Sequence, residues 1–253
     1  LADLGDVQLN YTLHGPAKAP PVVLVHALGT DQRIWDRVIP TLPDGLRILT
    51  FDLRGHGGTS VPEGPYSMGA LVRDAERLME FCEIRDSLFV GLSIGGMIAQ
   101  GLAVKRLDLI RALVLSNTAA KIGTPEIWQR RMAAIRADGL AAIGAETMQR
   151  WFPRAYLKSG AHAATQAIVE GTSVEGYLGC CAAVAGTDFY TPTSGLRLPT
   201  LGIAGSEDGS TPPDLVRETV DLIPGAQFAL MRRSGHVPPI DQPEAYGARL
   251  TQF

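Results

Sequence analysis

The sequence predicts an α/β protein with a mostly parallel central sheet, flanked by helices and interrupted by a helical insertion. Three observations lead to this class. Short buried apolar runs such as Val22–Val25 and Ala112–Ser116 alternate with segments of helical spacing. A glycine-rich turn, residues 91–96, joins a strand directly to a helix. Between Ala120 and about Thr187 no buried strand run occurs, although strands resume later.

Size and composition restrict the class further. The 253 residues (27.0 kDa) suit one α/β domain that carries an insertion. A net charge of −3 provides no basic face for nucleic acid or an anionic membrane. No apolar run is long enough for a membrane span and no signal-peptide pattern begins the chain, so we expect a cytoplasmic protein. Cys82, Cys180 and Cys181 form neither a disulfide framework nor a zinc pattern and are expected to be packing residues.

The elements before the insertion follow from periodicity. Residues 7–13 alternate between apolar and polar side chains, which predicts an edge strand. Continuous branched runs predict buried strands, and apolar residues at helical spacing predict helices that pack one stripe on the sheet. The strands are expected at Val22–Val25, Arg47–Phe51, Leu88–Val90 and Ala112–Ser116, and the helices at Asp31–Leu42, Met68–Cys82 and from Met97 onward.

The insertion defines the predicted domain organisation. Ala- and Gly-rich segments at helical spacing occupy it, including Pro125–Leu140 and Ala141–Phe152, and strands resume at Pro199–Gly205 and Ala226–Met231. We therefore expect a core made of residues 1–119 and 188–253 and a helical cap made of residues 120–187, inserted after the sixth strand. A cap in this place would cover the carboxyl edge of the sheet, where open α/β sheets bind ligands.

The strand-to-helix turn is the strongest chemical signal. Gly91-Leu92-Ser93-Ile94-Gly95 reads Gly-x-Ser-x-Gly, and a turn this tight forces a strained serine backbone that exposes the hydroxyl above the sheet. The Ile94 N–H then lies at the positive end of the new helix and is a candidate oxyanion donor. The loop after Val22–Val25 can supply a second donor, the Ala27 N–H.

A serine nucleophile needs a base, and the base needs an acid to orient it. Asp208 and His236 each follow a predicted strand, so both belong at the sheet edge of Ser93, in the chain order Ser, Asp, His. Glu207 competes for the acid position, and spacing does not separate it from Asp208. His56 is the rival for the histidine position.

Other polar residues near strand ends are expected to hold loops. His26 follows one buried strand, and Asp52 and Arg54 follow the next. Because loop backbone groups need hydrogen-bond partners, we interpret these side chains as loop-stabilising rather than catalytic.

The motifs resemble a known family along essentially the whole chain. The turn Gly91–Gly96, the loop Asp52–Gly57 and the pair Gly235-His236 resemble the α/β-hydrolase superfamily, which implies the α/β-hydrolase fold and a Ser93, Asp208, His236 triad. More narrowly, three segments resemble 3-oxoadipate enol-lactonases: Gly91–Gln100, Gly176–Ala183 and Ser234–Pro239. Those enzymes hydrolyse an enol-lactone of the β-ketoadipate pathway of aromatic degradation. The resemblance favours Asp208 over Glu207 and implies no metal or organic cofactor.

The resemblance also suggests how a small carboxylated lactone would be held. A helix that begins after Thr124 carries Trp128 and Arg131 three residues apart, so an indole N–H and a guanidinium could converge on one carboxylate. Similarity to the family favours this pair. The alternative is that Trp128, Met132 and Ile135 form an apolar packing stripe and that Arg131 is a solvated surface charge.

Three other interpretations remain at this stage. The chain could be a different carboxylesterase, or a C–C bond hydrolase that acts on ring-cleavage products. It could also be a ligand receptor built on a hydrolase fold, although a complete triad argues against that. The sequence does not distinguish an acyl-enzyme from direct attack by water activated at His236.

Overall fold

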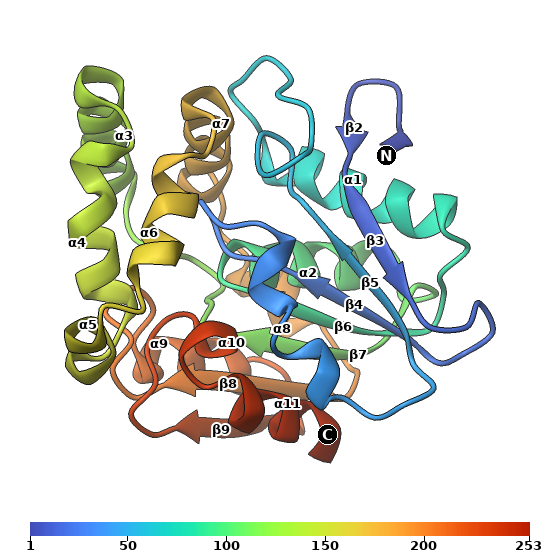
Figure 1. The fold of residues 1–253 in the computed structure, drawn as a ribbon. Helices are drawn as coiled ribbons and strands as arrows, with labels where there is room; N and C mark the ends of the chain where they lie inside the picture. The colour runs from blue at the N-terminus through green and yellow to red at the C-terminus, as the bar shows by residue number, and fades with distance from the viewer.

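The computed structural model describes residues 1–253 and is built on a seven-stranded sheet with the order β3-β5-β4-β6-β7-β8-β9 (Figure 1). Only the edge strand β3 runs antiparallel to its neighbour, β5. The sheet strands are β3 (Tyr11–His14), β4 (Pro21–Val25), β5 (Arg47–Phe51), β6 (Ser87–Leu92), β7 (Ile110–Ser116), β8 (Thr200–Gly205) and β9 (Gln227–Met231), while β1 (Ala2–Asp3) and β2 (Gln8–Leu9) form a separate pair.

Helices surround this sheet and cover it. The helix α2 packs against β6, β7 and α1, α9 packs against β8, and the short helix η1 contacts β4 and β5. The helices are η1 (Gln32–Trp35), η2 (Ile39–Thr41), α1 (Met68–Phe81), α2 (Ile94–Lys105), α3 (Pro125–Asp138), α4 (Ala141–Trp151), α5 (Arg154–Ser159), α6 (Ala163–Glu170), α7 (Val174–Ala185), α8 (Tyr190–Ser194), α9 (Pro213–Asp221), α10 (Pro238–Asp241) and α11 (Pro243–Gln252).

The buried runs of the sequence form the centre of the sheet. Val23, Leu24 and Val25 of β4 are fully buried, as expected for a parallel strand covered on both faces. No helix is both long and apolar enough to cross a membrane.

The helices α3 to α8 connect β7 to β8 in the chain. Of these, α3 to α7 stand on the side toward which the arrows of β7, β8 and β9 point (Figure 1). They therefore face the carboxyl edge of the sheet. The predicted position after the sixth strand is off by one. The strand β7 is the fifth of the seven-stranded sheet in chain order, because the only further strands before it, β1 and β2, pair outside that sheet.

Two other predictions need correction. Residues 7–13 do not form one strand: they divide between β2 and β3 at Asn10, whose backbone N–H donates to Thr59 Oγ1 (2.9 Å) instead of to a neighbouring strand. The helix predicted over residues 31–42 is two short 3₁₀ helices, η1 and η2. Pro40, within η2, lacks the N–H that a continuous α-helix needs at that position.

Candidate active site

The turn between β6 and α2 has the strained backbone that the sequence predicts. Ser93 has φ of 58° and ψ of −115°, a conformation that side chains rarely adopt. The chain can turn this sharply because its neighbours are small. A Cβ on Gly91 would overlap the backbone of Gly95, and one on Gly96 would overlap the Thr118 side chain. The turn therefore fixes the Ser93 hydroxyl at the carboxyl end of β6.

Three side chains from distant segments form one hydrogen-bond chain at this edge. His236 Nε2 lies 3.0 Å from Ser93 Oγ, and His236 Nδ1 lies 2.8 Å from Asp208 Oδ2. A carboxylate accepts, so Nδ1 carries the proton and Nε2 is free to accept one from the hydroxyl. Ser93 is 9% exposed, His236 2% and Asp208 5%. This arrangement is of the kind that makes a serine hydroxyl nucleophilic.

The surroundings of Asp208 keep it ionised. Burial by itself would raise its pKa, but the neighbouring His236 and the hydrogen bonds from Asn117 and Thr211 lower the pKa below its ordinary value. Besides His236, Oδ2 accepts from Thr211 Oγ1 (2.8 Å), and Oδ1 accepts from the backbone N–H groups of Ser210 (2.7 Å) and Thr211 (2.9 Å). The competing acid Glu207 is exposed, and its side chain makes no hydrogen bond to His236.

Asn117 is a member of the site that sequence reasoning missed. It follows β7 with φ of 46°, and its amide donates to both Asp208 Oδ2 and the Gly235 carbonyl, each at 3.0 Å. It thereby joins the loop of the acid to the loop of the histidine. The sequence does contain one signal for it: an asparagine directly after a buried strand, at the sheet edge where Ser93 lies. Asparagine tolerates the positive φ that a sharp turn at such a position can need.

Two backbone N–H groups near the Ser93 turn, those of Ala27 and Ile94, have no backbone hydrogen-bond partner. Val25 pairs with Gly91 in the sheet, so the loop that follows β4 runs beside the turn, and a Cβ on Gly95 would lie 3.0 Å from the His26 carbonyl. The Ile94 N–H begins α2 and has no partner within that helix. The Ala27 N–H makes no hydrogen bond within the chain. Both N–H groups therefore remain unpaired beside Ser93.

The two other buried histidines, His26 and His56, hold the Ala27 loop rather than acting near Ser93. His26 accepts at Nε2 from the Leu53 N–H (2.9 Å), and His56 accepts at Nε2 from the Gly29 N–H (3.0 Å). Each Nδ1 faces a backbone carbonyl, which fixes both rings as neutral Nδ1–H tautomers. Burial, and for His56 the nearby His26, lower both pKa values, that of His56 to about 3. His56 is therefore not part of the Ser93 chain.

Asp52 and Arg54 are likewise occupied in loop contacts. Asp52 accepts from the backbone N–H groups of Gln32 (2.8 Å) and Gly58 (2.9 Å). Arg54 forms a buried two-bond pair with Asp74, both bonds being 2.6 Å. These contacts tie the loop after β5 to η1 and α1.

The expected convergence of Trp128 and Arg131 is not observed. The indole N–H of Trp128 donates to the Ile122 carbonyl (2.6 Å), so it has no free donor for a ligand. Arg131 donates from Nη2 to Tyr177 OH (2.6 Å) and to Thr147 Oγ1 (2.9 Å), which places it among α3, α4 and α7. The indole N–H turns inward because the backbone of the preceding loop offers the nearer acceptor, a competition that helical spacing does not reveal.

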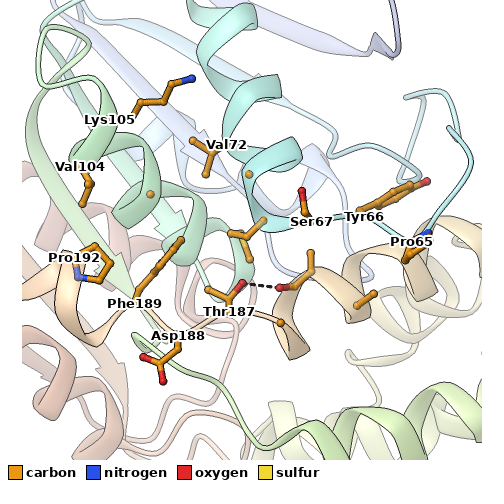
Figure 2. Close-up of a pocket in the computed structure, with 16 residues that line it drawn as sticks. Pro65, Tyr66, Ser67, Val72, Val104, Lys105, Thr187, Asp188, Phe189 and Pro192 are labelled. Carbon is orange, nitrogen blue, oxygen red and sulfur yellow. Dashed lines mark hydrogen bonds between the residues drawn. The ribbon is translucent and has the colours of Figure 1, made fainter.

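A separate cavity of about 770 Å³ lies between α1, α2, α7 and α8. Figure 2 shows Val72, Lys105 and Phe189 among its lining residues. None of the residues around Ser93 lines it, so the cavity is distinct from the candidate active site.

The fold and the Ser93 site define the class of protein. The chain belongs to the family described as alpha/beta hydrolase fold, whose family model matches residues 20–243. It is a hydrolase of that fold.

Within the class, the chain is similar to enol-lactonases. It is 31% identical to 3-oxoadipate enol-lactonase 2 of Acinetobacter baylyi over 95% of this chain and 91% of that protein. The crystal structure of the enol-lactonase from Burkholderia xenovorans has a TM-score of 0.95 at 32% identity and covers 99% of this chain and 98% of that one. A thermophilic esterase from Thermogutta terrifontis has a TM-score of 0.91 at 27% identity, with 99% and 94% covered.

Proposed function

We propose that the protein opens the ring of 3-oxoadipate enol-lactone to give 3-oxoadipate, the hydrolytic step of the β-ketoadipate pathway of aromatic degradation. The observation that carries the proposal is the Ser93–His236–Asp208 hydrogen-bond chain in a protein that shares 31–32% identity with enol-lactonases along nearly its whole length.

In the first half of the reaction, Ser93 Oγ attacks the lactone carbonyl while His236 Nε2 takes its proton. The Ala27 and Ile94 N–H groups stabilise the oxyanion. The ring C–O bond then breaks and leaves the acyl group on Ser93. The leaving enolate takes the proton held by His236 and becomes a ketone, which returns His236 to its neutral form. Because an enolate is a stable leaving group, the ring C–O bond breaks with little assistance from an acid.

In the second half, His236 removes a proton from water, and the hydroxide attacks the acyl group. The C–O bond to Ser93 breaks, the serine oxygen recovers its proton from His236, and 3-oxoadipate is released. Asp208 stays ionised and stabilises the imidazolium in both halves, which its lowered pKa supports.

The free carboxylate of the substrate needs a cation, and Arg131 is the residue we propose for it. No acidic side chain pairs with this guanidinium, and Tyr177 and Thr147 fix its orientation. Trp128 has its N–H engaged, so its indole can contribute only an apolar surface. We also propose that residues 120–187 act as the cap that encloses this substrate over the core of residues 1–119 and 188–253.

The test is the loss of ultraviolet absorbance of freshly generated enol-lactone. We expect rapid loss with the wild type, none above background with Ser93→Ala, and little turnover of p-nitrophenyl acetate by either. A fluorophosphonate probe should label the wild type and not Ser93→Ala.

Each contrary outcome has a distinct meaning. Hydrolysis of the ester without hydrolysis of the lactone would retain the serine mechanism and replace the substrate, in line with the similarity to the Thermogutta terrifontis esterase. Absence of labelling at Ser93 would refute the serine mechanism itself.

A further inference from the structure

Arg150 occupies a position next to the acid of the Ser93 site. It lies in the last turn of α4, and its carbonyl accepts from the Gly209 N–H at 2.9 Å. A Cβ on Gly209 would lie only 3.2 Å from the Arg150 Cα, so the two backbones are in close contact. The next residue, Trp151, accepts from the His236 N–H (2.7 Å) and packs its ring against the imidazole, with centroids 5.6 Å apart.

The guanidinium of Arg150 has no adequate partner. Its Nε is buried and makes no hydrogen bond. Its salt-bridge partner, Glu146, lies 3.8 Å from Nη1, and the side chains of Arg150 and Glu146 are 38% and 66% exposed. The buried hydroxyl of Ser210, which follows Gly209, also lacks a partner. Buried donors are normally satisfied, so the unpaired Arg150 Nε and Ser210 Oγ indicate a place for a ligand.

A second guanidinium lies close by. Arg131 donates to Thr147, which precedes Arg150 by three residues and therefore lies on the same side of α4. Burial and the charge of Arg131 both lower the pKa of Arg150. Neither guanidinium makes a hydrogen bond to a carboxylate. Two cations that repel each other in this way are stabilised by an anion that binds both.

We propose that Arg150 and Arg131 together bind the carboxylate of the substrate, so that Arg150 is a specificity-determining residue of this enzyme. This inference rests on the proposed function for the identity of the substrate. It extends that function by adding a second cation, Arg150 of α4, to Arg131 of α3. Arg150 lies on the side of Asp208 and His236. The ligand class is a short aliphatic chain with a terminal carboxylate.

The test measures binding of adipate, a six-carbon dicarboxylate, by isothermal titration calorimetry, with dimethyl adipate as the neutral analogue. We expect Arg150→Met to weaken adipate binding about tenfold, the effect of losing one charge-assisted contact at a partly exposed site. The matched control is Arg130→Met on the exposed side of α3, which should leave the adipate Kd unchanged. Urea unfolding verifies that each variant is folded.

The proposal is refuted if folded Arg150→Met binds adipate within twofold of the wild type, if Arg130→Met weakens it equally, or if the wild type does not bind adipate. Should Arg150→Met fail to fold, Glu146→Gln decides: removing the competing carboxylate should tighten adipate binding two- to threefold, and no change refutes the proposal. Because the assay needs no turnover, adipate binding that depends on Arg150 can stand even if the lactone is not hydrolysed.

Discussion

Asn117 offers a direct test of how the site is assembled. Replacing it with alanine removes the amide that joins the Asp208 loop to the Gly235 loop. Both acceptors are buried and stay in place, so the variant leaves the Asp208 carboxylate and the Gly235 carbonyl each short of one donor. Alanine must also adopt the φ of 46° that asparagine tolerates.

The expected cost follows from these contacts. A lost hydrogen bond to a charged group is worth about 1.5–3 kcal/mol and one to a buried carbonyl about 1 kcal/mol. Positive φ in a residue other than glycine or asparagine adds about 1 kcal/mol. We therefore expect the free energy of unfolding of Asn117→Ala to fall by about 3.5–5 kcal/mol. Activity should fall at least tenfold, because Asp208 and His236 lose their shared support.

Urea unfolding measures the first effect, and lactone hydrolysis at saturating substrate measures the second. Asp86→Ala is the matched control, since Asp86 has φ of 51° but is exposed, and its side chain makes only one long contact, to Arg111 (3.4 Å). It should show the cost of the backbone alone. If the free energy of unfolding falls no more in Asn117→Ala than in Asp86→Ala, the bridging role assigned to Asn117 is refuted.

Three further predictions concern the turn, the buried rings and the end of α4. Ser93→Gly should be more stable to urea than Ser93→Ala by about 1 kcal/mol, because only glycine relieves the strained φ, and equal stability would contradict the strain. In the folded protein the pKa of His56 is about 3, so its ring stays neutral above about pH 3. In the unfolded chain the same ring takes up a proton below about pH 6.5. The free energy of unfolding should therefore fall as the pH is lowered through that range, by up to about 1.4 kcal/mol per pH unit. His56→Gln should lessen this dependence on pH between pH 7 and pH 5. Gly235→Ala should lower the free energy of unfolding by more than about 2 kcal/mol, since its Cβ would overlap the Trp151 carbonyl. Gly186→Ala should not lower it by that amount, because the nearest atom to its Cβ, the Ala182 carbonyl oxygen, is 3.4 Å away.

Much of the fold could be predicted because periodicity and capping are local. The helices α1 and α3 begin at the predicted residues, where Ser67 and Thr124 each accept a hydrogen bond from the backbone of the first turn. The buried strands also occur where branched runs predict them. The short segment over residues 31–42 was harder, because 3₁₀ and α-helical turns share the same apolar spacing over so few residues.

The candidate site likewise contains residues that the sequence predicts and contacts that it does not. Ser93, Asp208 and His236 could be predicted because each lies in the turn or loop that follows a strand, and strand ends of a parallel sheet meet at one edge. The choice of Asp208 over Glu207 required either the family resemblance or the structure. The partners of Trp128 and Arg150 depend on contacts between segments that are not neighbours in the sequence, so no local pattern contains them.

The sequence by itself determined the fold class, the order of its elements and the chemistry at Ser93, because these depend on the period of the apolar residues and on the small residues of one turn. Only the tertiary structure decided which polar groups are already satisfied and which remain free. The Trp128 indole is engaged by a backbone carbonyl, while Arg150, brought beside Asp208 by the packing of α4, keeps an unpaired donor. Hydrogen-bond satisfaction is a property of assembled surfaces, and it becomes fixed only when distant segments meet.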